Sequence, residues 1–112
     1  MVCCQDLPQG VSVAVCAGLT DRQLMLYGGE LEPSARGHAG AGNFSSQAAV
    51  FSLGAAAGGL KETWRGSGPP ARGWADGAVW RGERLVVVGG LTGDDTKPVR
   101  LADVWVGELE QQ

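Results

Sequence analysis

Hydrophobic and polar positions follow the same order at two places in the chain. The segment LTDRQLMLYGG, residues 19–29, aligns without a gap with WRGERLVVVGG, residues 80–90, at an offset of 61 residues. Each segment has a polar, turn-forming stretch, then four apolar residues, then Gly-Gly. A polar turn followed by an apolar run is typical of a hairpin that leads into a buried strand. Each segment therefore predicts such a hairpin.

The alignment extends to both sides of this segment. Small residues at 11–18 and 71–79 precede the two turns, and SQAAVFSL (46–53) corresponds to ADVWVGEL (102–109) at an offset of 56 residues. KETWRG (61–66) adds a fourth strand to the first repeat only. The order predicts an all-β fold of four-stranded antiparallel blades, with strands a to d in the first repeat and a to c in the second. The expected divisions are an N-terminal extension (1–10), a first blade (11–70), a second, incomplete blade (71–109) and a C-terminal tail (110–112).

The motifs of both repeats resemble those of the kelch-repeat β-propellers. Gly28-Gly29 with Trp64, and Gly89-Gly90 with ADVWVGEL, carry this resemblance, which extends from about residue 11 to residue 109. The segments GELEPSARGHAGAGNF, PPARGW and LVVVGG are also similar to a subgroup related to nitrile-specifier and epithiospecifier proteins. The family implies about two blades of an incomplete β-propeller. Specifier proteins are thought to use an iron(II) site of Glu-x-x-x-Asp-x-x-x-His form, which this chain lacks, so no metal ligand carries over.

Composition narrows the classes of partner. The 19 glycines and 5 prolines favour short elements joined by tight turns. A net charge of −3 with scattered basic residues predicts neither nucleic-acid nor membrane binding. The start MVCCQDLPQG has no signal-peptide pattern, and no apolar run could span a bilayer, so we expect a cytoplasmic protein. Cys3, Cys4 and Cys16 have no metal-ligand spacing, and we expect reduced thiols.

The connections at one end of the blades are the expected binding surface. In an antiparallel blade the b–c and d–a connections lie at the same end, which places 36–44, 66–73 and 91–100 together. Loops at one end of a rigid scaffold commonly carry binding chemistry. The candidate residues are Glu30, Arg36, His38, Arg72, Trp74, Asp94, Asp95, Lys97 and Arg100. A bidentate clamp of Arg36 and Arg72 on a carboxylate or acidic peptide is the strongest specific hypothesis, although plain surface charge is commoner.

Other chemistry has weaker support in these loops. Gly37, Gly40 and Gly42 reverse the dinucleotide spacing, and no helix follows to hold a phosphate. Glu30 and Glu32 with His38 have donor atoms for a metal, but one histidine is weak evidence. Asp94 and Asp95 are typical of a solvated turn in which Asp caps its own backbone. No triad or nucleophile elbow occurs, so we expect no catalytic residue, no metal and no cofactor.

The sequence thus predicts a binding module with a protein or ligand partner. One alternative is a piece of a specifier-like or other enzymatic propeller whose active site lies in other blades. A second is a truncated gene product without independent function. Two blades alone would leave apolar sheet faces uncovered, so we expect association with copies of the chain or with a partner propeller, or aggregation.

Overall fold

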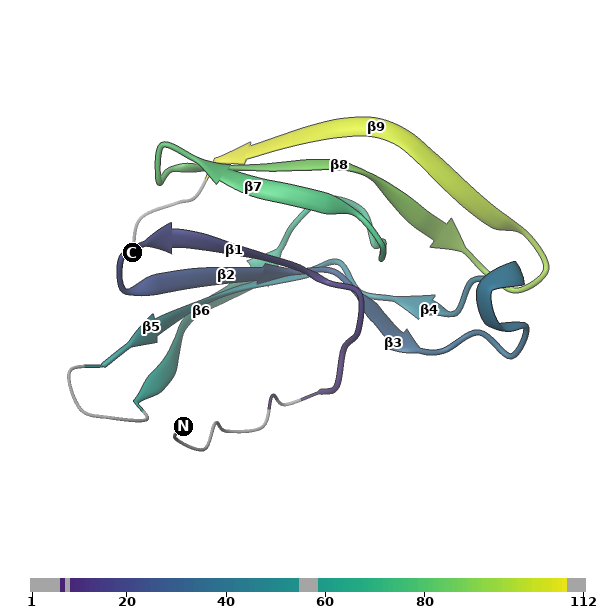
Figure 1. The fold of residues 1–112 in the computed structure, drawn as a ribbon, viewed down its shortest axis with the longest axis horizontal. Coiled ribbons are helices and arrows are strands. Elements are labelled where there is room, and N and C mark those ends of the chain that lie inside the picture. The colour runs from purple at the N-terminus through teal and green to yellow at the C-terminus, as the bar shows by residue number, and fades with distance from the viewer. Residues whose placement is uncertain (1–6, 8, 55–58, 109–112) are drawn as a thin grey trace.

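The computed structural model describes residues 7, 9–54 and 59–108, and in these ranges the chain is all-β (Figure 1). The first sheet is antiparallel in the order β1-β2-β5-β6. The second sheet is antiparallel in the order β7-β8-β9. The strands are β1 (Val15–Thr20), β2 (Gln23–Tyr27), β5 (Gln47–Leu53), β6 (Leu60–Ser67), β7 (Asp76–Trp80), β8 (Arg84–Gly93) and β9 (Pro98–Glu108). The predicted antiparallel order of four strands and then three is confirmed.

A small ribbon lies within the first b–c connection. It pairs β3 (Glu30–Glu32) with β4 (Asn43–Phe44), and a single 3-10 turn, η1 (Gly37–Ala39), lies between them. In the second repeat the corresponding stretch is the outer part of the long β8–β9 hairpin, which pairs to Gly93 and Pro98. The sequence pattern predicted a loop at both places, so these paired segments are additional structure.

Strands β1 and β7 begin later than expected, at Val15 and Asp76 rather than at 11 and 71. The reason is a break in the extended backbone at Val13 and Trp74, which have φ values of 51° and 59°. These two positions are 61 residues apart, so the break belongs to the repeat. Strands require negative φ, and a left-handed residue therefore ends the regular pairing.

The paired glycines allow close contact between backbones. Gly29 and Gly90 have φ values of 102° and 108°, where side chains are strongly disfavoured. A Cβ atom on Gly90 would lie 2.7 Å from the carbonyl oxygen of Gly73, and one on Gly29 would lie 2.8 Å from that of Ser12. In the first repeat the strand ends at Tyr27, as predicted. In the second, β8 continues through Gly89-Gly90 with a shift of register, because the following residues pair with β9.

The core lies between the two sheets, with β1 against β7 (Figure 1). The face of the first sheet that points to the core carries Met25, Tyr27, Ala48 and Val50, called here the first inner face. Leu85 and Val87 of the second sheet pack on it. Alternation along β8 points these two side chains to the same face. Burial of these apolar groups is the main stabilising contribution at this interface.

Trp64 and Trp105 both lie where the two sheets meet. Trp64 packs against the core cluster. Trp105 remains 42% exposed, and both side chains line a cavity of about 270 Å³ between the sheets. Trp105 also makes a polar contact, which is described below.

Some predictions concern residues outside the described ranges. These are most of the N-terminal extension with Cys3 and Cys4, residues 55–58 of the loop GAAAGG, and the C-terminal residues 109–112. Cys16 is a free, exposed thiol. In the described part of the chain no helix has the length and apolar character needed to cross a bilayer.

Candidate binding site at the loop end

The two b–c connections, which were expected at one end of the molecule, are hydrogen-bonded to each other. Arg36 Nη1 donates to the backbone carbonyl of Asp95 at 2.6 Å, and the backbone N–H of Ala35 donates to Asp95 Oδ2 at 3.2 Å. The hydroxyl of Ser34 donates to the other oxygen of the same carboxylate. Residues 34–36, just before η1, are thereby fixed to the turn between β8 and β9, at the right of Figure 1.

A cavity of about 630 Å³ lies between these connections and the d–a crossover. Three of the candidate residues line it, namely Glu30, Trp74 and Arg100. The remaining lining residues are Pro33, Ser34, Gly37, Gly40, Gly90, Leu91 and Leu101. A site of this volume with apolar walls and a few polar groups is typical of ligand-binding clefts.

The chemistry of the cavity combines a flat aromatic surface with two opposite charges. Trp74 is 53% exposed, although its backbone N–H is held by the carbonyl of Val13 at 3.0 Å. Glu30 is half-buried and Arg100 is exposed. Leu91 and Leu101 come from the paired strands β8 and β9, whose ladder fixes their positions. The cavity could therefore hold a group with an apolar part and both donor and acceptor atoms.

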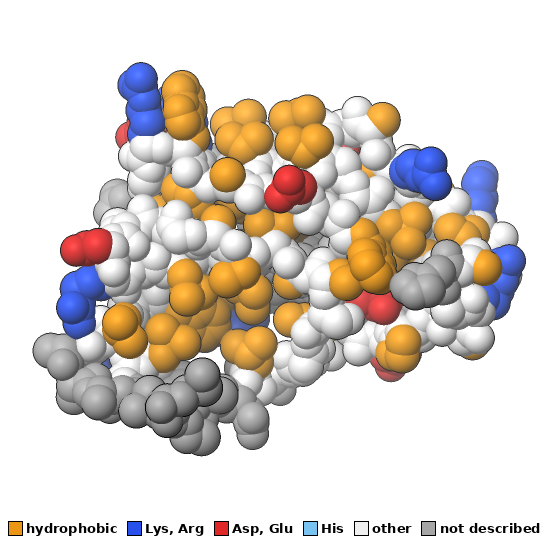
Figure 2. All heavy atoms as spheres, in the orientation of Figure 1, with side chains coloured by type: hydrophobic (Ala, Val, Ile, Leu, Met, Phe, Trp, Pro, Cys, Tyr) orange, Lys and Arg blue, Asp and Glu red, His pale blue; other side chains and the backbone are white. Residues whose placement is uncertain are grey.

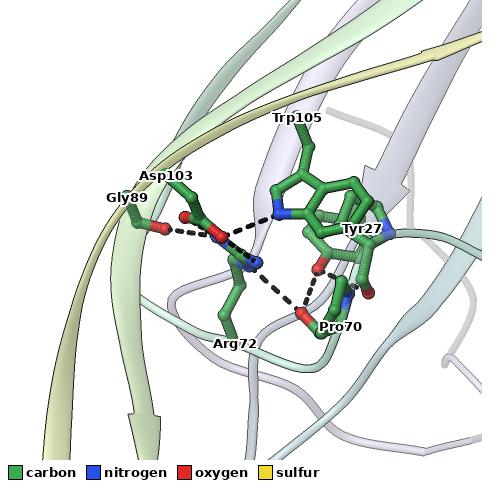
Figure 3. Close-up of polar contacts among 7 residues, drawn as sticks. Tyr27, Pro70, Arg72, Gly89, Asp103 and Trp105 are labelled. Carbon is green, nitrogen blue, oxygen red and sulfur yellow. Dashed lines mark hydrogen bonds and ion pairs between the residues drawn. The ribbon is translucent and has the colours of Figure 1, made fainter.

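Arg72 does not belong to this surface, so the expected clamp with Arg36 is not formed. Its side chain is 1% exposed and lies between the two sheets. Nη1 and Nη2 donate to Asp103 Oδ1 and Oδ2 at 2.6 and 3.0 Å (Figure 3). Nη1 also donates to the carbonyl of Gly89 at 3.0 Å, and Nε donates to that of Pro70 at 3.1 Å. The carboxylate that Arg72 binds is thus supplied by the chain itself.

Asp103 links Arg72 to Trp105 in this network, which joins the d–a crossover to β8 and β9 (Figure 3). Trp105 Nε1 donates to Asp103 Oδ2 at 2.7 Å. Hydrogen bonds from Arg72 and Trp105 lower the pKa of Asp103 to about 2. The same ion pair raises the pKa of Arg72. Asp103 was read only as part of a strand, because a pairing across 31 residues leaves no local signal.

Tyr27 closes the network on the side of the first sheet. Its hydroxyl donates toward the carbonyls of Pro69 and Pro70, at 2.9 and 2.8 Å (Figure 3). Burial raises the pKa of Tyr27, against the lowering effect of the nearby Arg72. These groups are mutually satisfied, and the cluster therefore holds the crossover 66–73 in place.

Asp94 and Asp95, in the second b–c connection, have different roles. Asp94 Oδ1 accepts hydrogen bonds from the backbone N–H groups of Thr96 and Lys97, both at 2.9 Å, and from the Thr96 hydroxyl at 2.6 Å. The hydroxyl is the main cause of the lowered pKa of Asp94. The predicted self-capped turn is confirmed for Asp94. Asp95 instead binds the first loop, and Lys97 is exposed.

The metal hypothesis gains no geometric support. His38 lies in η1, and its side chain is outside the described part of the structure. Among the side chains that are described, no group of three or more His, Cys, Asp or Glu could hold a metal ion.

Comparison with known proteins does not assign the chain to a family. No protein-family model matches the chain, and no curated protein matches it either.

Proposed function

We propose that the chain is a pair of kelch-type β-propeller blades that binds a protein segment at its loop end. The observation that carries this proposal is the cavity of about 630 Å³, built by both b–c connections and the residue that follows the d–a crossover. The antiparallel sheets of four and three strands and the two Gly-Gly pairs support the blade architecture. Each blade alone would provide only one b–c connection, and the cavity forms only where the connections of two blades meet.

The chemistry of the lining favours a peptide over a small anion. Glu30 and Arg100 provide an acceptor and a donor of opposite charge, whereas a site for an anion alone would gather positive groups. Trp74 is 53% exposed and offers apolar surface to an apolar side chain, and tryptophan and arginine are frequent anchors in protein interfaces. The ligand is therefore a segment with an apolar side chain between polar or charged backbone and side-chain groups.

The test selects ligands without assuming a natural partner. Randomised displayed peptides are selected on the full chain, and the dissociation constants of the resulting peptides are measured by titration. The variant E30Q/R100Q removes both charges from the cavity; Glu30→Gln preserves side-chain size, whereas Arg100→Gln also shortens the side chain. We expect it to weaken binding about tenfold or more, because each charge-assisted hydrogen bond contributes on the order of 1.5–3 kcal/mol.

The matched control is E83Q/R81Q, which removes one acid and one base from the β7–β8 turn. These residues do not line the cavity. The control should bind as the unmodified chain does, and far-UV circular dichroism checks that all three proteins are folded. Peptides that bind E30Q/R100Q unchanged, or a selection that yields no peptide, would contradict the proposed site.

A further inference from the structure

The second sheet carries an exposed apolar face on the side away from the core. Val86, Val88, Val104 and Val106, called here the valine face, lie side by side on β8 and β9, with Val86 opposite Val106 and Val88 opposite Val104. Val88, Val104 and Val106 are 49%, 63% and 59% exposed. Hydrophobic side chains stand out from this sheet at the top of Figure 2. Contiguous exposed apolar residues of this kind mark interaction surfaces.

The valine face is the repeat counterpart of the first inner face. Along strand b the corresponding residues are 61 positions apart, and along strand c they are 56 positions apart. The pairs are Met25 and Val86, Tyr27 and Val88, Ala48 and Val104, and Val50 and Val106. Their cross-strand register is the same in both sheets. In the first sheet all four members are at most 7% exposed, because the second sheet covers them.

The residues of the second sheet that cover the first inner face also have repeat counterparts. Leu85 and Val87 cover the first inner face, and their repeat counterparts are Leu24 and Leu26 on the opposite side of the first sheet. Leu24 and Leu26 are half-buried. Leu26 lines a groove of about 330 Å³ on this outer face, together with Leu7, Gln9, Val11, Ala49 and Arg65, among others. Each outer side of the molecule therefore repeats one half of the contact between the two sheets. The Leu24–Leu26 side corresponds to Leu85 and Val87, and the valine face corresponds to the first inner face.

We propose that the valine face binds a second copy of this chain, which docks the Leu24–Leu26 side of its first sheet there. The contact repeats the arrangement of the two sheets within one chain, with Leu24 and Leu26 in the places of Leu85 and Val87. A contact between two different surfaces of identical chains is head-to-tail, and it closes into a ring when the rotation per copy divides a full turn. Because propellers typically have four to eight blades and each copy would supply two, the expected ring has two to four copies.

The test mixes two variants, each with one damaged surface. The variant V104K/V106K damages the valine face, and L24K damages the opposite side. Sedimentation velocity should show that each variant alone is a monomer at concentrations where the unmodified chain associates. Loss of two buried valines should weaken association by about 100-fold. An equimolar mixture should form a 1:1 dimer, because each variant retains the surface that the other lacks.

Each other outcome contradicts the proposal in a defined way. If L24K alone still dimerises while V104K/V106K does not, the valine face binds itself and the head-to-tail contact is wrong. A mixture that stays monomeric would also show that the head-to-tail contact is wrong, because each variant retains the surface that the other lacks. The control V99K changes a 38% exposed valine of β9 outside the valine face and should associate as the unmodified chain does. If a lysine variant does not fold by circular dichroism, the milder L24T and V104T/V106T replace it.

Discussion

The two sheets share one strand pattern but differ in what covers them. Val50 of the first sheet and Val106 of the second have the same place in the repeat, and each lies opposite a strand b residue in the same register. Val50 is 7% exposed, whereas Val106 is 59% exposed. Repeated sequence therefore sets strand register, while burial depends on whether a neighbouring sheet is present. This difference in exposure is the basis for our proposal that the valine face is an interface left uncovered within one chain.

The largest expected effect comes from breaking the network that joins the crossover to the second sheet. Arg72→Met keeps a long apolar side chain but removes the ion pair with Asp103 and the hydrogen bonds to the carbonyls of Pro70 and Gly89. We expect the free energy of unfolding to fall by about 3 kcal/mol, since the carbonyls of Pro70 and Gly89 and the partly exposed carboxylate of Asp103 lose their hydrogen bonds from the buried guanidinium together.

The control for this prediction is Arg36→Met at the exposed loop end. The Arg36 side chain donates one hydrogen bond, to the carbonyl of Asp95, and its loss should change the free energy of unfolding by about 0.5 kcal/mol or less. Urea denaturation of both variants measures the difference. Equal losses in the two variants would show that Arg72 has no special structural role.

The next effect tests the comparison of the two sheets directly. Val50→Ala should reduce the free energy of unfolding by about 2 kcal/mol, because it removes buried methyl groups and leaves a cavity. Val106→Ala, the same change at the equivalent position, should cost about 0.5 kcal/mol or less in the monomer. Both are measured at low protein concentration, where association does not add to stability. Similar costs would mean that the valine face is already covered within one chain.

The smallest effect concerns pH and the carboxylate of Asp103. Its pKa is about 2 in the folded chain and lies below the ordinary value of 3.8, so its ionised form stabilises the fold. This contribution is present above the ordinary pKa and is lost as pH falls toward about 2. Unfolding of the unmodified chain and of Asp103→Asn is compared from about pH 5 downward. The two free energies should converge as pH falls, and a constant difference would contradict the assigned role.

The strand order followed from local patterns and could be predicted. Polar turns, apolar runs and Gly-Gly pairs are short-range signals, and they gave the a to d and a to c orders correctly. The late starts of β1 and β7 were missed, because a valine and a tryptophan at positive φ are rare and contradict their own preferences. The β3–β4 ribbon was missed because three-residue and two-residue strands leave almost no periodicity.

The sequence predicted which candidate residues lie close together only where the placement of the loops is enough to decide it. Glu30, Trp74 and Arg100 come together because their connections lie at the same end of the sheets. Arg72 was placed wrongly because arginine is usually exposed, and its burial depends on Asp103, which is distant in sequence. A charged residue in a tight crossover is predicted to be exposed unless its ion-pair partner is known.

The most direct measurement of the central claim is the solution mass of the unmodified chain by light scattering over a concentration series. If the valine face binds another copy, the mass should rise from the monomer value of 11.6 kDa and level off at a discrete multiple of two to four times that value. A mass that stays at 11.6 kDa at every concentration, with a sharp thermal transition, would contradict the claim that the second sheet is an open half of a repeating interface.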